Sequence, residues 1–326
     1  MMLKYVFLNS LGRLRSGWRV TLFLASYFVL SVFYLLFILP FLKFLPLGFT
    51  QNNLAELTIT FTFFSAVAIF FGWFYGKFFE DLPFRALGCG FTENWLKDLI
   101  FGLIIGAVSI LLAALIAFSG GGLKFEFNQT ANGSAILLTL GATLLIFIFG
   151  AISEETLFRG YILQTLFRAR FVWLAIFLTS LLFASAHNNN PGANPLSWLN
   201  TLIAGIWFTI AYYKTRTLWL PFGLHLMWNW MQGAILGTPV SGLEQLTPAP
   251  LFHSADAGPV WLTGGNYGIE GGIACTIILI LATIFIWLAP FLKPSEKMLI
   301  LTDREKPVAK VKPAETNLAE NFRNGK

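Results

Sequence analysis

The chain is poor in charged residues and in cysteine, and both shortages limit what it can be. Charged residues make up 12% of its 326 residues, against roughly 25% in a soluble domain. Hydrophobic residues make up 56% and the mean hydropathy is +0.69, which excludes an ordinary soluble domain. The two cysteines, Cys89 and Cys275, lie far apart among apolar neighbours. They cannot form a disulfide framework or a cysteine-rich metal centre.

The chain consists largely of long apolar segments. They predict an all-α, polytopic membrane protein with about eight transmembrane helices around an intramembrane cavity. The first segment, 20–42, has 23 residues without a charge, too many for a signal peptide, so we expect a retained helix. Asn188–Gly192 predicts a turn between the fifth and sixth helices. The expected segments are about 20–42, 56–76, 99–118, 135–166, 172–187, 198–213, 217–236 and 271–292.

The basic residues predict the orientation and the division of the chain. With the N-terminus in the cytoplasm, most of the 22 Lys and Arg residues fall in cytoplasmic segments, and Lys43 and Lys124 lie on the other side. We therefore expect a membrane domain over 1–292 and a cytoplasmic, disordered tail over 293–326. The basic residues form no patch on a polar domain, so nucleic acid is not an expected partner.

Ionisable side chains inside apolar segments are costly and are therefore functional candidates. Glu154 and Glu155 follow a run without charge, and Arg159 lies one turn after Glu155. The i,i+4 spacing predicts an ion pair between Glu155 and Arg159. Glu154 points about 100° away around the helix. It can therefore keep a different environment and serve as a general base.

Two histidines are expected near these glutamates. In an antiparallel hairpin, Glu154 and His187 both reach roughly 22–26 Å from the cytoplasmic end, so they can face each other. On the seventh segment, His225 and Asn229 are also spaced i,i+4 and share one helix face. The alternative for this pair is a polar contact that holds helices together.

These motifs resemble a known family. Glu154-Glu155-xxx-Arg159, Phe183-xxx-His187 and His225-xxx-Asn229, in this order on successive apolar segments, are similar to the CAAX protease and bacteriocin-processing family of intramembrane proteases, which includes the type II CAAX prenyl endopeptidases. The resemblance covers about 145–230 strongly, and we expect the protease core at about 135–236. It extends more loosely to 15–19 and to the glycine-rich loops at 237–242 and 264–272.

The resemblance implies roles for the matching residues. Glu154 and His187 would activate a water, and His225 and Asn229 would stabilise the oxyanion formed on a peptide carbonyl. Glu155, Arg159 and Phe183 would support the site or bind substrate. The expected partners are the lipid bilayer and a membrane-associated peptide or protein, with prenylated CAAX-type peptides as one candidate. The expected location is the bacterial plasma membrane.

The sequence leaves the metal and the function class open. A divalent metal such as zinc could be held by Glu154, His187 and His225 with water in the fourth position, or the glutamate could activate water without a metal. The chain lacks the His-Glu-x-x-His motif of ordinary zinc proteases. The alternatives to a protease are a non-catalytic scaffold or bacteriocin-immunity protein of the same fold, and a proton-linked transporter.

Overall fold

Each apolar segment predicted from the sequence coincides with a helix in the computed structural model, which describes residues 6–45, 53–303 and 305. The helices are α2 (Ser16–Phe33), α3 (Leu39–Phe44), α4 (Asn53–Glu80), α5 (Trp95–Ser119), α6 (Gly133–Glu155), α7 (Leu163–Arg168), α8 (Val172–Ala186), α9 (Pro195–Thr215), α10 (Trp219–Trp230), α11 (Val260–Thr263), α12 (Ile273–Leu288) and α13 (Glu296–Thr302). π-Helical stretches join or extend several of them: Tyr34–Ile38, Thr156–Ile162 and Met231–Ile235. Short 3-10 turns are Phe84–Leu87, Glu244–Leu246, Gly265–Tyr267 and Ile269–Gly271.

Among the described residues, four helical stretches are long and apolar enough to cross a membrane. They are Ser16–Phe44, Asn53–Glu80, Trp95–Ser119 and Gly133–Arg168. The apolar helices Val172–Ala186 and Ile273–Leu288 are shorter; at 1.5 Å per residue, 15 residues reach about 22 Å, less than the roughly 30 Å hydrocarbon layer. The chain is thus a mostly helical membrane protein, and the expected count of eight spans is not confirmed.

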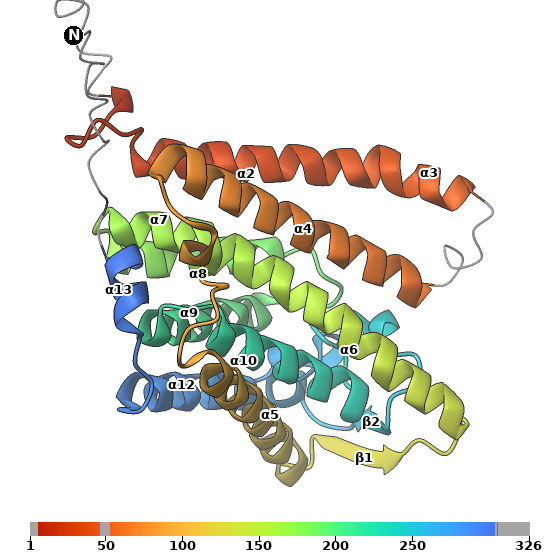
Figure 1. The fold of residues 1–326 in the computed structure, drawn as a ribbon. Coiled ribbons are helices and arrows are strands. Elements are labelled where there is room, and N and C mark those ends of the chain that lie inside the picture. Colours follow the sequence, from red (N-terminus) through yellow and green to blue (C-terminus); the bar gives the residue numbers. More distant parts are fainter. Residues whose placement is uncertain (1–5, 46–52, 304, 306–326) are drawn as a thin grey trace, which may run out of the picture.

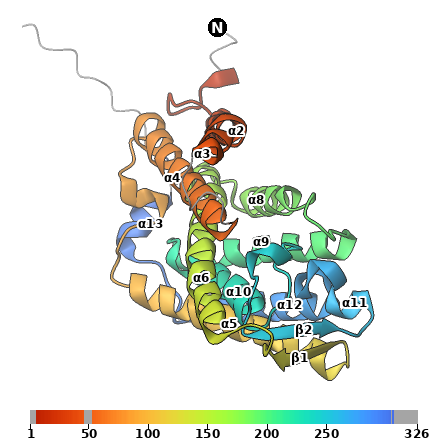
Figure 2. The same ribbon diagram turned by 90° about the vertical axis from the view of Figure 1, so that its right-hand side faces the viewer.

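The bundle has two helices at one edge and a long helix through its middle. In Figure 1, α2–α3 and α4 lie along the upper edge, α5 and α12 lie at the lower edge, and the continuous α6–α7 helix runs diagonally between them. The view in Figure 2 keeps this order and places α8 and α9 to one side of α6. The helices of the middle therefore face protein on most sides, as the fully buried Trp207, Leu220 and Leu224 indicate.

Helices α5 and α10 approach each other closely because glycines lie at their crossing. A Cβ atom on Gly102 would lie 2.4 Å from the Leu220 carbonyl oxygen, and one on Gly106 would lie 2.4 Å from that of Leu224. Small residues four positions apart allow such packing between membrane helices. This contact holds α10, which carries His225 and Asn229, against α5.

Two features depart from a purely helical reading. The strands β1 (Leu123–Phe127) and β2 (Phe252–Asp256) pair antiparallel, with Phe125 opposite Ser254, so the all-α prediction missed a two-stranded sheet built from two loops. Within the predicted tail, α13 is capped by Ser295; residues 306–326 of that prediction lie outside the described residues. In Figure 1 the sheet and α13 lie at opposite ends of the bundle, which we call the sheet end and the α13 end.

Candidate active site

The two glutamates lie where the α6 helix changes its winding. α6 ends at Glu155, and Thr156–Ile162 continue as a π-helix into α7. π-Helical turns within α-helices are rare and occur frequently at functional sites, because the wider turn alters the angular spacing of side chains. Nothing in the local sequence predicted this change.

Glu155 is held from two sides inside the protein. Nη1 of Arg159 donates to Oε1 of Glu155 at 3.0 Å, and Nδ1 of His225 lies 2.8 Å from the same oxygen. Glu155 is 1% exposed and Arg159 is 0% exposed. The ion pair expected from the i,i+4 spacing therefore forms, and it lies behind the cavity that the other candidate residues line.

Arg159 has further partners that account for its complete burial. Its Nη2 donates to the carbonyl oxygen of Gly205 at 3.1 Å. Its guanidinium carbon lies 4.6 Å from the ring centroid of Phe183 and 5.1 Å from that of Phe208. A carboxylate, a carbonyl and two aromatic faces together stabilise a desolvated cation. Arg159 is thus built into the scaffold and does not face the cavity.

Glu154 has a different environment one residue earlier. It lines a cavity of about 80 Å³, which has room for several waters because one needs about 10–15 Å³. Its side chain is 27% exposed, yet its Oε2 is buried and has no hydrogen-bond partner among the described residues. A buried carboxylate oxygen without a donor is costly, so this position calls for a water or a substrate group.

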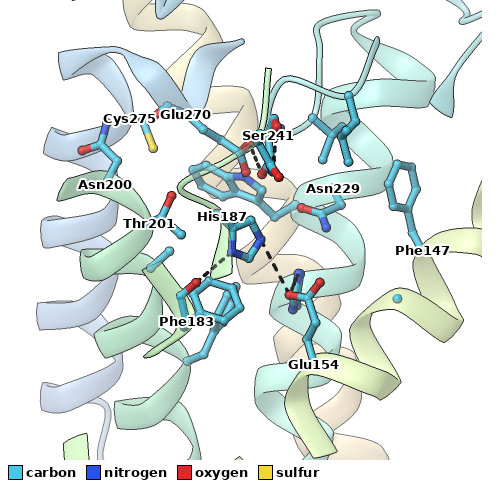
Figure 3. A pocket seen from close by; sticks show the side chains of 18 of the residues that line it. Phe147, Glu154, Phe183, His187, Asn200, Thr201, Asn229, Ser241, Glu270 and Cys275 are labelled. Atoms are coloured by element: carbon cyan, nitrogen blue, oxygen red, sulfur yellow. Dashed lines mark hydrogen bonds and ion pairs between the residues drawn. The ribbon is translucent and has the colours of Figure 1, made fainter. Parts of the chain in front are cut away.

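Both histidines direct Nε2 toward that oxygen. Nε2 of His187 lies 4.0 Å from Oε2 of Glu154, and Nε2 of His225 lies 3.8 Å from it; the first approach is drawn in Figure 3. The Nδ1 atoms face the Phe183 carbonyl at 2.8 Å and the Glu155 carboxylate. Both of these partners accept hydrogen bonds, so each Nδ1 carries a proton.

Aromatic packing fixes the two imidazole rings. The His225 ring stacks on Phe208 with centroids 4.8 Å apart and an interplanar angle of 16°. Phe183 lies 4.8 Å from the His187 ring and 6.1 Å from the His225 ring. Phe183 therefore contacts both imidazole rings and the guanidinium of Arg159. These contacts explain why a phenylalanine lies one helical turn before His187.

Asn229 follows His225 by one helical turn, and both side chains line the cavity. Figure 3 shows the Asn229 amide beside the space between Glu154 and Ser241. Its N–H groups are not used in any side-chain bond among the described residues, so they can donate to a group in the cavity.

The predicted metal ligands do not have the spacing of a metal centre. Ligand atoms around tetrahedral zinc, with bonds of about 2.0–2.2 Å, lie roughly 3.4 Å apart. The distances from Glu154 to the histidine nitrogens are longer, at 4.0 and 3.8 Å. Within the part of the chain that the structure describes, no three His, Cys, Asp or Glu side chains are arranged to hold a metal ion.

The other end of the same cavity is polar, and the sequence did not predict that its residues would line the cavity. Glu270 accepts from Trp228 Nε1 at 3.1 Å and from the backbone N–H and the hydroxyl of Ser241 at 2.6 and 2.9 Å. The glycine-rich loops that hold Ser241 and Glu270 stood out in the sequence, but nothing assigned them a role. We call this region the loop end of the cavity; it is formed by Asn190, Asn200, Trp228, Ser241 and Glu270.

The comparisons with known proteins concern the segment that carries these side chains. Residues 136–231 match the family model described as type II CAAX prenyl endopeptidase Rce1-like, so the resemblance inferred from the sequence is confirmed for this segment. An uncharacterized 24.3 kDa protein of Escherichia coli is 38% identical over 94 residues, which cover 28% of this chain and 41% of that protein. No solved structure matches. The matched segment is similar to a protease family and contains all three motifs.

The predicted residues thus fall into two groups. Glu154, Phe183, His187, His225 and Asn229 line one cavity, whereas Glu155 and Arg159 lie behind it. The distinction made from the sequence between the two glutamates therefore corresponds to two different positions in space.

Proposed function

We propose that this protein is an intramembrane endopeptidase that hydrolyses a peptide bond of a membrane-associated peptide. The observation that carries the proposal is the buried Oε2 of Glu154, which has no hydrogen-bond partner among the described residues and lies 4.0 and 3.8 Å from two histidine nitrogens in a cavity. The family match over residues 136–231 supports a protease. Prenylated CAAX-type peptides are the substrate class to test first, in the bacterial plasma membrane with both termini cytoplasmic.

The nucleophilic water would lie between Glu154 and His187. Oε2 of Glu154 is an acceptor, and Nε2 of a neutral His187 is also an acceptor because its Nδ1 carries the proton. Two acceptors 4.0 Å apart are bridged by a water that donates both hydrogens. Its oxygen lone pairs then face the substrate carbonyl, and Glu154 takes the proton as the bond forms. The same carboxyl group delivers that proton to the leaving amine.

His225 and Asn229 would stabilise the oxyanion. Glu154, Glu155 and Arg159 together carry one net negative charge, which a site in low dielectric tolerates poorly. A second proton on His225 makes the group neutral, because its two nitrogens face the carboxylates of Glu155 and Glu154. The Nε2–H of His225 and the amide of Asn229 then donate to the developing charge, where such bonds contribute most.

Glu155, Arg159 and Phe183 act as positioning residues in this proposal. Glu155 orients His225 through Nδ1, while Phe183 supports both imidazole rings. Arg159 donates to the Glu155 carboxylate and holds it in position.

The test uses purified protein in liposomes and a pool of prenylated and unmodified peptides, with products read by mass spectrometry. Wild type is compared with Glu154→Gln, which keeps the shape and removes the base, and with Glu126→Gln as the control at an exposed glutamate on β1. We expect cleavage by wild type and by the control, and none by Glu154→Gln.

A second set of reactions with a chelator tests separately whether cleavage requires a metal ion. Cleavage that persists after extended chelation fits a glutamate-activated water, whereas loss that zinc restores would replace that step of the proposal. Cleavage unaffected by Glu154→Gln would contradict the assignment of the base. Transport of a solute without any cleavage would favour the transporter alternative.

A further inference from the structure

His187 lies at the end of α8, whereas His225 and Asn229 lie on α10, so the proposed reaction depends on how these two helices are held relative to each other. We propose that Glu270, at the loop end of the cavity, is a positioning residue that sets this arrangement. It acts through its hydrogen-bond partners and not on the substrate. This inference rests on the proposed function, because it concerns the alignment of the same site.

One oxygen of Glu270 holds α10. Nε1 of Trp228 donates to Oε1 of Glu270 at 3.1 Å, and Trp228 is 4% exposed. Trp228 follows His225 by three residues and directly precedes Asn229 on the same helix. A fixed indole therefore restricts the rotation of the helical turn that presents both side chains to the cavity.

The other oxygen of Glu270 is linked to His187 through a chain of hydrogen bonds. Oε2 of Glu270 accepts from the backbone N–H and the hydroxyl of Ser241 at 2.6 and 2.9 Å. The carbonyl oxygen of Ser241 accepts from Nδ2 of Asn190 at 3.0 Å, and the backbone N–H of Asn190 donates to the carbonyl oxygen of His187 at 3.2 Å. Figure 3 shows Glu270 and Ser241 together on the side of His187 away from Glu154. The carboxylate of Glu270 therefore joins the two halves of the proposed site.

Ser241 needs this carboxylate because its backbone conformation is unfavourable. Its φ is 50°, in the left-handed region that residues with a Cβ atom seldom adopt. Such a conformation persists where surrounding contacts hold it, and the two hydrogen bonds to Glu270 are such contacts. Loss of the carboxylate lets Ser241 relax, which turns the carbonyl group that binds Asn190.

The loops around this chain of hydrogen bonds are packed closely through their backbones. A Cβ atom on Gly242 would overlap the carbonyl oxygen of Pro191, and one on Gly268 would overlap that of Pro239. The N–H of Gly242 also donates to the carbonyl oxygen of Tyr267 at 3.0 Å. Backbones this close leave little room for independent movement, so the loops that follow α8, α10 and α11 shift together.

The backbone of Glu270 is fixed independently of its side chain. The amide nitrogen of Asn200, on α9, donates to the carbonyl oxygens of Glu270 and Gly272 at 2.8 and 2.9 Å. A change confined to the carboxylate leaves this anchor in place, so side-chain variants can test positioning in the folded protein. Glu270 also lies beyond the family match over residues 136–231, so the alignment of the matched motifs depends on a later part of the chain.

The experiment compares wild type with Glu270→Gln on the peptide that the wild-type protein cleaves in liposomes. Glutamine keeps the shape, but one terminal oxygen becomes an NH₂ group, which cannot accept a hydrogen bond from Trp228 or Ser241. We expect kcat to fall by about 10–10²-fold, the scale of a misplacement of up to about 1 Å, with KM changed by less than about twofold. Glu244→Gln is the matched control, because Glu244 is an exposed carboxylate in the same outer loops and should leave kcat unchanged.

A double-mutant cycle tests whether Glu270 acts through α10. Trp228→Phe removes the indole donor and should lower kcat in the wild-type background. In the Glu270→Ala background the hydrogen bond is already absent, so the same change should have a smaller effect. Thermal unfolding of each variant separates the alternatives, because a purely structural Glu270 would change the unfolding temperature and leave kcat per folded molecule unchanged.

Unchanged kcat in Glu270→Gln, or a raised KM at unchanged kcat, would overturn the inference while leaving the peptidase proposal intact. Equal effects of Trp228→Phe in the two backgrounds would overturn it as well. If the Glu270 variants do not fold, Trp228→Phe decides the matter, since this variant keeps the carboxylate and an unchanged kcat would contradict the link to α10. No cleavage by wild type would refute the proposed function, and the inference would fall with it.

Discussion

Two groups of buried charges in this bundle both pair glutamate with arginine but differ at one carboxylate oxygen. At the α13 end, Glu80 accepts from Thr165 through one oxygen and from Arg168 through the other, at 2.7 and 2.6 Å, and Arg19 lies 3.1 Å away. In the middle of the bundle, Glu155 pairs with Arg159 and His225 through Oε1, whereas Oε2 of the adjacent Glu154 lies beside the cavity with no hydrogen-bond partner among the described residues. In the first group, which we call the closed group, both oxygens of the glutamate accept hydrogen bonds. In the second group, one glutamate oxygen faces the cavity without a donor from the described residues.

The difference shows what distinguishes a structural charge from a candidate catalytic one. Deep burial does not mark the candidate base, since Glu80 and Glu155 are both buried whereas the Glu154 side chain is 27% exposed. Glu305 also joins the closed group, through Arg19 and Asn9, so several segments hold it together. An acceptor without a donor, beside a space that admits water, marks the site. Substitutions in the closed group should therefore lower stability, and substitutions at the cavity should lower activity.

The largest expected effect is on activity. Glu154→Gln should lower kcat by about 10²–10⁴-fold, the typical contribution of a general base. Its unfolding temperature should stay at or above the wild-type value, because the change removes an unpaired buried charge. Thermal unfolding in detergent, measured beside the cleavage assay, checks both parts. A variant that loses activity and stability together would make Glu154 a structural residue like Glu80.

The next effect concerns the oxyanion. Asn229→Ala should lower kcat by about 10²–10³-fold with little change in KM, because the amide donates to charge that develops in the transition state. Steady-state kinetics on the identified peptide measure the two constants separately. A rise in KM at unchanged kcat would instead make Asn229 a substrate-binding residue.

A substitution within the closed group should lower the stability of the protein. Glu80→Ala removes the buried partner of Arg168 and one of the two partners of Arg19, which typically costs about 3–5 kcal/mol and lowers the unfolding temperature by on the order of ten degrees. Asp81→Asn is the control: Asp81 pairs with Arg13 at 2.9 Å but is 67% exposed, so it should cost less than about 1 kcal/mol. An equal loss in both variants would contradict the role of burial.

Arg159→Lys tests the support behind the site. A lysine cannot keep the contacts to Glu155 and Gly205 together with the packing against two aromatic rings, so we expect a loss of about 1–2 kcal/mol. Arg170→Lys should be nearly neutral, because Arg170 is 55% exposed. Unchanged stability of Arg159→Lys would show that the guanidinium shape is not needed.

The last prediction concerns local opening around Cys89, just after the 3-10 turn Phe84–Leu87. Burial raises the pKa of the Cys89 thiol to about 12, so the thiolate is scarce at neutral pH and increases only as pH rises toward that value. Since the thiolate reacts, maleimide labelling at pH 7 should be about 10³-fold slower than for a free thiol. Glu80→Ala should speed labelling if it loosens this end, and fast labelling of wild type would contradict the burial.

Much of the site could be predicted because its contacts are local in sequence. The pair Glu155–Arg159 and the shared face of His225 and Asn229 follow from helical spacing. The approach of His187 to Glu154 followed from the lengths of two helices joined by a short turn. The orientation of the termini and the division at residue 292 stay predictions.

Other parts could not be predicted because they depend on contacts between distant segments. Ser241 and Glu270 lie in glycine-rich loops whose spacing carries no helical or strand period, so only their folded positions bring them to the cavity. The strands β1 and β2 are five residues each and more than a hundred residues apart. A short alternating segment in a loop gives no partner by itself.

The amino-acid sequence by itself determined that the chain enters a membrane, where its helices lie, and which charged residues lie inside them. The hydrophobicity of about 20 consecutive residues, and the free-energy cost of a charge among them, depend on each segment alone. The tertiary structure decided which glutamate is open to the cavity, how α6 unwinds into a π-helix after Glu155, and that Glu270 closes the far end. These depend on the packing of helices around one space, and no single segment contains that information.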